Sequence, residues 1–135
     1  MSKGRASTLI PVYPVAVAAI GPMIAAAPAQ ADVGDKGGVL LSHINATRVA
    51  NGCSPVAANP QLTASAARHA NDMLRNGVQG HIGSDGSSLV QRVVDAGYTP
   101  YAALGEVVFW SRGSASAPAA AVTWWMNSPG HRAVI

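Results

Sequence analysis

The chain has 135 residues, of which 49% are hydrophobic and 11% are charged, and its formal net charge is +3. It contains neither a basic run nor aromatic residues interleaved with arginine, so we expect no nucleic-acid-binding surface. This length suits one domain with one modest core and leaves no room for a second domain.

The first 31 residues predict a cleavable secretory signal peptide. Lys3 and Arg5 form a short positive start, and an apolar stretch follows from Leu9 to Ala27. The triplet 29–31 has the A-x-A pattern that a signal peptidase needs, because its subsites admit only short side chains. The predicted cut therefore lies after residue 31.

A transmembrane anchor is the alternative interpretation of the apolar stretch. Prolines at positions 11, 14, 22 and 28 interrupt it, so it cannot supply about twenty uninterrupted helical apolar residues. Cleavage leaves 104 residues with seven basic and six acidic side chains, a net charge of about +1. We expect a protein that is secreted, extracellular or in the cell envelope, with no membrane span after signal cleavage.

The domain is predicted to begin at residue 39. Residues 32–38 are polar and glycine-rich, which is typical of a flexible lead, and residues 39–135 form the domain. A first helix is predicted at 39–50, because Leu40 and Ile44 recur at helical spacing and an Asn-Gly pair then supplies a stop.

A second helix is predicted at 60–76. Asn59 can cap its first turn and Pro60 suits its first position, where the missing N–H costs nothing. The Asn-Gly pair at 76–77 ends it. One face carries Leu62, Ala66, His69 and Met73. His69 is therefore expected to be a hydrogen-bonded core histidine, whereas His43 is expected to be solvated.

The remaining elements follow from turn residues and apolar spacing. In chain order they are a loop at 77–88, a helix from Ser88 to Gly97, a strand at 106–110, and a helix from Pro118 that ends at the turn 127–130.

Cys53 is the single cysteine of the chain. In an exported protein an unpaired thiol suggests an intermolecular bridge, a free reactive group or a partner that the chain lacks. A small buried residue is the equally plausible alternative.

Three polar residues at element boundaries are the candidate site: His81, Glu106 and His131. Two imidazoles and one carboxylate can hold a divalent metal such as zinc and leave a coordination position open. The alternative is that they are unrelated loop residues, because ligands so far apart in sequence have no spacing to test. No compact metal, nucleophile or phosphate-loop motif is present.

The order of motifs resembles bacterial members of the CAP superfamily, the cysteine-rich secretory, antigen 5 and pathogenesis-related proteins (SCP-like domains). The motifs are Asn45–Arg48, Asn59–Leu62, Ala67–Met73, Gly80–Ser88, Gly105-Glu106 and Trp125–Arg132. The resemblance implies an α+β fold, a three-layer α-β-α sandwich with a central cleft. It also implies structural roles for Asn45, Arg48, Cys53 and Trp125.

The family cleft is typically lined by two histidines and two acidic residues. The resemblance places His81 and His131 at the histidines and Glu106 at the first acid. The second acidic position falls at Ser128, which removes one carboxylate, and Val107 stands where the family usually has asparagine.

The resemblance further implies that the domain is truncated at its C-terminus. Similar proteins continue through inner strands and often a second cysteine, a natural partner for Cys53. We therefore expect part of the central antiparallel sheet to be missing, unless 33–41, 53–56 or 98–103 supplies an unrecognised strand. Open sheet edges would make such a domain unstable or prone to aggregate.

The family resemblance favours a non-catalytic exported binding module for a lipid- or sterol-like ligand or an extracellular partner. One alternative is a metal-dependent hydrolase or protease in which His81 and His131 hold the ion and Glu106 is a ligand or general base. The other is a degenerate relative without activity of its own.

Overall fold

The computed structural model describes residues 36–111 and 118–135. The signal peptide predicted at 1–31 and the first four residues of the predicted lead lie outside the described residues. The helices are α1 (Lys36–Ala50), α2 (Pro60–Asn76), α3 (Leu89–Asp95), α4 (Pro118–Met126) and α5 (Pro129–Arg132).

Helix α2 has the bounds and the caps that the sequence predicts. The Asn59 side chain accepts a hydrogen bond of 3.1 Å from the Leu62 N–H, and Pro60 occupies the first turn. Gly77 adopts a left-handed conformation with φ 69°, and its N–H donates to the Met73 carbonyl. Glycine suits this position because a side chain would strain the same backbone.

Substituting Asn59 with alanine should destabilise the domain by about 0.5–2 kcal/mol, because the first turn of α2 loses its side-chain acceptor. Urea denaturation measures the loss. Asn51→Ala is the control, since Asn51 lies beyond α1 and its side chain contacts only a carbonyl of that helix. Equal stability of the two variants would contradict the capping role.

Three helix predictions need adjustment. Helix α1 begins at Lys36 rather than at residue 39, so the last three residues of the predicted lead are helical. Helix α3 ends at Asp95, two residues before Gly97. The turn predicted at 127–130 is limited to residues 127 and 128, and the short helix α5 begins at Pro129, which fits the first helical turn.

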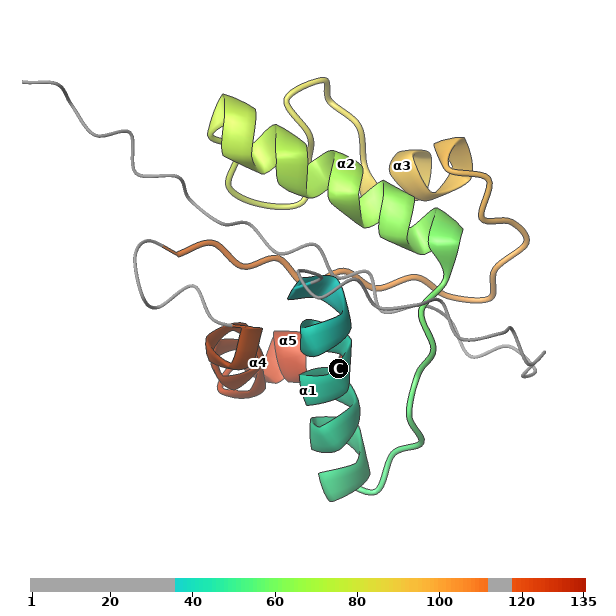
Figure 1. The fold of residues 1–135 in the computed structure, drawn as a ribbon. Coiled ribbons are helices and arrows are strands. Elements are labelled where there is room, and N and C mark those ends of the chain that lie inside the picture. The colour runs from blue at the N-terminus through green and yellow to red at the C-terminus, as the bar shows by residue number, and fades with distance from the viewer. Residues whose placement is uncertain (1–35, 112–117) are drawn as a thin grey trace, which may run out of the picture.

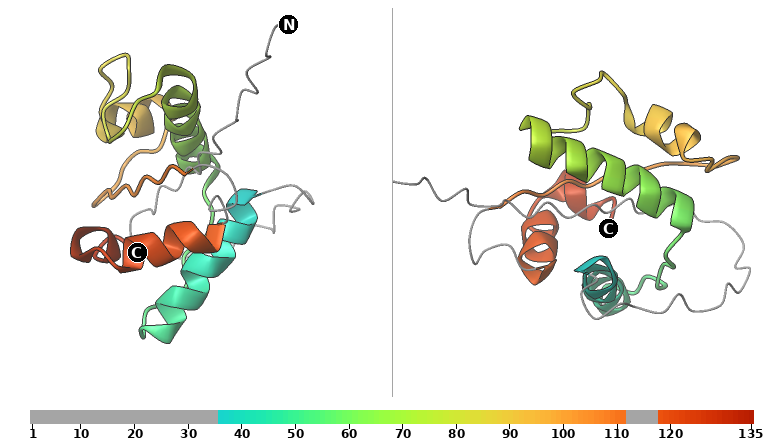
Figure 2. Two further views of the ribbon diagram at one scale, coloured as in Figure 1. Left: turned by 90° about the vertical axis from the view of Figure 1, so that its left-hand side faces the viewer. Right: turned by 45° about the horizontal axis from the view of Figure 1, so that its top comes forward.

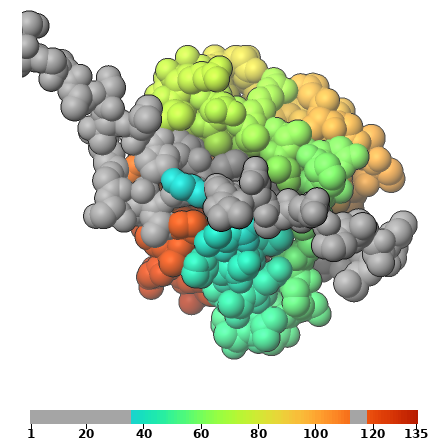
Figure 3. Space-filling model, in the orientation of Figure 1, coloured from blue at the N-terminus to red at the C-terminus, as the bar shows by residue number. Residues whose placement is uncertain are grey.

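The helices form two groups separated by an extended segment at 98–111 (Figures 1 and 2). Helix α4 contacts both α1 and α5, and α2 contacts α3, whereas no helix of one group contacts a helix of the other among the described residues. In the space-filling view, α2 and α3 lie above α1 and α4 (Figure 3). The central segment therefore connects two helical layers.

The strand predicted at 106–110 does not form a continuous ladder. Within the described residues, β-type pairing is limited to isolated bridges at Leu104, Val107 and Trp110. The Val108 carbonyl instead accepts a hydrogen bond of 3.0 Å from the indole N–H of Trp125. This hydrogen bond joins the segment to α4 rather than to a neighbouring strand. The three-layer sandwich is thus not formed as a regular sheet in this structure.

The main core lies between the central segment and the group that contains α1 and α4. Val107 and Phe109 alternate along the segment and point into it, while Val108 between them is buried outside this cluster. Trp125 fills the centre with no exposed surface. The buried cluster comprises Leu40, Ile44, Val107, Phe109, Ala121, Val122, Trp125 and Ile135.

Asn45 and Arg48 join the end of α1 to the connection that follows it. The Asn45 amide forms two hydrogen bonds with the backbone of Val56, of 2.9 and 2.8 Å. Arg48 donates to the carbonyls of Ser54 and Ile135, so it joins α1 to the C-terminal segment. Cys53 is exposed and forms no disulfide, so the buried alternative is wrong.

None of the helices in the described residues is both long enough and apolar enough to span a membrane.

Candidate functional site

His81 and Glu106 meet where the loop after α2 passes the central segment. The Nδ1 atom of His81 lies 2.9 Å from Oε1 of Glu106. The His81 side chain is half exposed, whereas the Glu106 side chain is only 7% exposed. A carboxylate accepts a hydrogen from Nδ1, which fixes the ring and leaves Nε2 as the atom that can accept from a ligand.

Arg92 holds the other side of this carboxylate. Its Nη2 lies 2.7 Å from Oε2 of Glu106, and the Arg92 side chain is 1% exposed. Its Nη1 donates to the carbonyls of His81 and Ser87, at 3.0 and 2.9 Å. One buried guanidinium from α3 therefore neutralises Glu106 and holds the loop that carries His81 at two points, the carbonyls of His81 and Ser87.

Gly105, immediately before Glu106, allows close packing of the C-terminal segment. A Cβ atom at Gly105 would lie 2.8 Å from a methyl carbon of Val134. Any larger residue would push Val134 away or displace the carboxylate that follows.

The loop is also fastened to α2 by Asp72. This carboxylate accepts from the backbone N–H of Ser84 at 2.7 Å, from the Ser84 hydroxyl, and from the Asn76 amide at 2.6 Å. The side-chain hydrogen bonds from Ser84 and then Asn76 lower the pKa of Asp72. The charged carboxylate thus fixes the loop three residues after His81.

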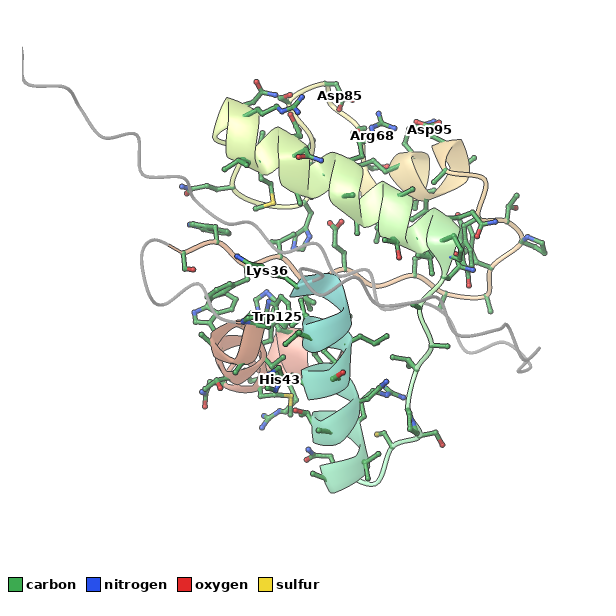
Figure 4. The ribbon with its side chains drawn as sticks, in the orientation of Figure 1. Lys36, His43, Arg68, Asp85, Asp95 and Trp125 are labelled. Atoms are coloured by element: carbon green, nitrogen blue, oxygen red, sulfur yellow. The ribbon has the colours of Figure 1, made fainter. Side chains whose placement is uncertain are left out.

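Arg68 forms a second attachment between α2, the loop and α3. It lies between two carboxylates, 2.9 Å from Asp85 and 2.7 Å from Asp95 (Figure 4). Hydrogen bonds from Ser87 and then from Arg68 lower the pKa of Asp85, and a hydrogen bond from Arg68 lowers that of Asp95. These pairs are solvent-exposed, so each contributes little alone.

The loop should loosen in acid. The pKa values of Asp72 and Asp85 in the folded chain lie below the usual 3.8. Their contribution to the stability of the folded loop is therefore complete above pH 3.8, and it is lost as the pH falls through the folded pKa. Amide hydrogen exchange at Ser84 and Ser87 should therefore accelerate between about pH 4 and pH 2, after correction for the intrinsic rate. Unchanged protection across this range would contradict the prediction, and the α2 core amides serve as the control.

His131 lies in a different environment, on α5. Its Nδ1 atom is 2.9 Å from the Ser128 hydroxyl, and its ring centroid is 4.9 Å from that of Trp124. Ser128 precedes α5 but its side chain does not cap that helix. Among the described residues, no hydrogen bond or ring contact joins His131 to His81 or Glu106. The structure thus brings two of the three predicted site residues into direct contact.

The other two histidines lie where the sequence predicts. His69 is 2% exposed and its Nε2 bonds to the Gly80 carbonyl at 2.7 Å, so it is a core histidine. His43 is exposed on α1 (Figure 4).

The three predicted metal ligands do not form one cluster in the described part of the chain. In the described parts of the chain, no three His, Cys, Asp or Glu side chains lie close enough together to hold a metal ion. Both oxygens of Glu106 are also committed, one to His81 and one to Arg92. The geometry gives Glu106 the role of orienting His81.

Arg92 is the site residue that sequence reasoning missed. It follows Leu89 by three residues and precedes the buried Val93, so it lies close to the apolar face of its helix. A lone arginine in that place is a signal for a buried acidic partner, because such a charge is rarely buried unpaired.

Comparison with protein families supports the resemblance read from the motifs. A profile described as "CAP: Cysteine-rich secretory protein family" matches residues 41–135. The chain belongs to the CAP family. The matched range contains α2 to α5 and all three predicted site residues of this CAP domain. No curated protein and no solved structure matches the chain.

Proposed function

We propose that this CAP domain is an exported, non-catalytic binding module for a lipid- or sterol-like ligand. The observation that supports it most is the surface around Trp124. This indole is 47% exposed although it packs against Phe109, at 6.0 Å between ring centroids, and against His131. A large aromatic residue held in place yet half exposed is a common feature of binding surfaces.

The surface around Trp124 has a polar part and an apolar part. Ser128 and His131 lie next to the indole and are partly exposed, so they can hydrogen-bond the hydroxyl or carboxyl group of an amphipathic molecule. The indole provides the apolar contact for the remainder of that molecule. A ligand with one polar end and one apolar body matches both halves.

A retention assay tests this function. The purified chain is incubated with radiolabelled palmitate or cholesterol and separated from free ligand by gel filtration. We expect one of the two to remain bound, and Trp124→Ala to weaken binding by at least about tenfold. Val49→Ala, at an exposed position on α1, is the matched control. No retention of either ligand by the unmodified chain would refute the proposal.

Export is a separate part of the proposal and rests on the charge order and A-x-A triplet of the first 31 residues. Expression of the full chain in a secreting bacterial host should yield a product that begins at Asp32. An intact Met1 on exported protein, or retention of the chain inside the cell, would contradict the predicted cleavage.

We also infer that residues 98–111 represent the central layer of a three-layer α-β-α sandwich. Family membership supports this assignment, as does the position of the segment between the α2–α3 pair and the other helices. The isolated bridges at Leu104, Val107 and Trp110 are the backbone positions where such a layer would pair. Slow hydrogen exchange at Val107 and Phe109 would support it, and exchange as fast as in an unfolded peptide would oppose it.

A metal-dependent hydrolase is the weaker candidate, because no three His, Cys, Asp or Glu side chains of the described residues group together as a metal site. Zinc uptake by the chain that is lost in His81→Ala and His131→Ala would favour it over the binding module. A relative without activity would show neither zinc uptake nor ligand retention.

A further inference from the structure

Two Asn-Gly pairs end helices in this chain: Asn51-Gly52 follows α1, and Asn76-Gly77 closes α2. An asparagine followed by glycine is chemically labile, because the unhindered glycine nitrogen can reach and attack the side-chain amide carbon. The two pairs have the same intrinsic chemistry. Any difference between them in the folded chain therefore comes from their surroundings.

The pair after α1 is exposed and loosely held. Asn51 and Gly52 are both exposed, in the turn at the lower end of α1 in Figure 1. The Asn51 amide has one hydrogen bond, of 2.8 Å to the Thr47 carbonyl, which also accepts from the Asn51 backbone N–H. This carbonyl belongs to the last turn of a helix, and helix ends fray. The Asn51 side chain is released whenever that turn opens.

The pair after α2 is held more firmly. Asn76 is the last residue of α2, and its amide donates to Asp72 at 2.6 Å and to the Ser84 hydroxyl at 3.2 Å. Hydrogen bonds from Ser84 and then from Asn76 lower the pKa of Asp72, so this acceptor is charged at neutral pH. A hydrogen bond to a charged group is roughly twice as strong as one between neutral groups. Both bonds must break before the Asn76 amide can turn toward Gly77.

The two glycine nitrogens do not account for the difference. The Gly52 N–H donates to the Val49 carbonyl and the Gly77 N–H to the Met73 carbonyl, each at 3.0 Å. Both glycines are also left-handed, with φ of 79° and 69°. The attacking nitrogen is therefore equally committed in the two pairs, and the hold on the side-chain amide decides which pair reacts.

We propose that Asn51 is a site of spontaneous deamidation in the folded protein, whereas Asn76 is protected. The Gly52 nitrogen loses its hydrogen and bonds to the side-chain amide carbon of Asn51, and ammonia leaves, so a succinimide ring forms. Water then opens this ring. Attack of water at the side-chain carbonyl yields aspartate, and attack at the backbone carbonyl yields isoaspartate.

The product changes the connection that follows α1. A carboxylate replaces a neutral amide beside the last carbonyls of α1, where the helix dipole disfavours negative charge. Isoaspartate also adds a carbon to the backbone just before Cys53, whose N–H donates to the Arg48 carbonyl at 2.9 Å. Deamidation should therefore loosen the turn that presents the exposed thiol. The reaction does not depend on a bound lipid.

Peptide mapping by mass spectrometry tests the proposal. The intact folded chain is incubated at mildly alkaline pH, and the peptides that contain each pair are followed for conversion of amide to acid, with isoaspartate separated by chromatography. We expect Asn51 to convert at least about tenfold faster than Asn76, because the bond from Asn76 to a charged carboxylate must first be broken. In urea, the control, the two pairs should convert at similar rates.

A substitution tests the protection of Asn76 directly. Asp72→Ala removes the charged acceptor, so conversion at Asn76 should rise toward its rate in urea while conversion at Asn51 stays unchanged. If this variant fails to fold, the comparison within the unmodified chain still decides. Conversion of Asn76 as fast as that of Asn51 in the folded chain would overturn the proposal. So would an unreacted Asn51 in the folded chain after the chain in urea has converted.

Discussion

Arg92→Met should destabilise the domain by about 3–5 kcal/mol, the usual cost of removing one partner of a buried ion pair. The substitution leaves Glu106, 7% exposed, without its cation. It also leaves the carbonyls of His81 and Ser87 without the donor that Arg92 provides. Urea denaturation of the variant and of the unmodified chain measures the difference.

A second substitution separates charge from packing. Arg92→Met combined with Glu106→Leu removes both charges, so much of the lost stability should return. Arg92→Lys keeps the charge but not the planar donor set, so its loss should be intermediate. A loss below about 1 kcal/mol for Arg92→Met alone would be typical of a surface ion pair, and it would contradict the role of Arg92 as the buried partner of Glu106.

Trp125→Ala should cost about 3–5 kcal/mol, because it leaves a large cavity in the main core. Trp125 has no exposed surface, and its ring packs edge-on against Phe109 at 6.3 Å between centroids. The Val108 carbonyl also loses the indole N–H that it accepts in the folded chain. Calorimetry or urea denaturation reports the loss.

The preceding residue provides a matched control. Trp124 is 47% exposed, so Trp124→Ala should cost about 1 kcal/mol or less. If the two alanine variants lost equal stability, the assignment of Trp125 to the core and Trp124 to the surface would be wrong.

The helices could be predicted because their ends depend on local chemistry. Asn59 and Ser88 cap α2 and α3 through their own side chains, and Gly77 ends α2 in a left-handed conformation that suits glycine. Such signals depend on a few neighbouring residues, and a single sequence contains all of them.

The strand and α5 could not be predicted in the same way. Residues 106–110 have strand-like composition, but strand pairing depends on backbone partners elsewhere in the chain, which local composition does not specify. Pro129 and Gly130 suit both a turn and a short helix, and the helical outcome is accompanied by packing of α5 against α4.

The candidate site was predictable only in part. Position and family resemblance indicated His81 and Glu106, which are in contact. Nothing in the spacing of Arg92 or Asp72 shows that one reaches two carbonyls and the other a loop hydroxyl, because these contacts exist only in the folded chain. In the same way, residue type indicates that Glu106 can be a ligand, but not that its two oxygens bond to His81 and Arg92.

The most direct test of the central claim, that the surface around Trp124 binds an amphipathic ligand, is an NMR titration of the chain with the retained palmitate or cholesterol. The two adjacent indole N–H signals provide an internal comparison. The account predicts a saturable shift at Trp124 and none at Trp125, whose N–H is buried and bound to Val108. A shift at neither indole, or an equal shift at both from a general change in fold, would contradict it.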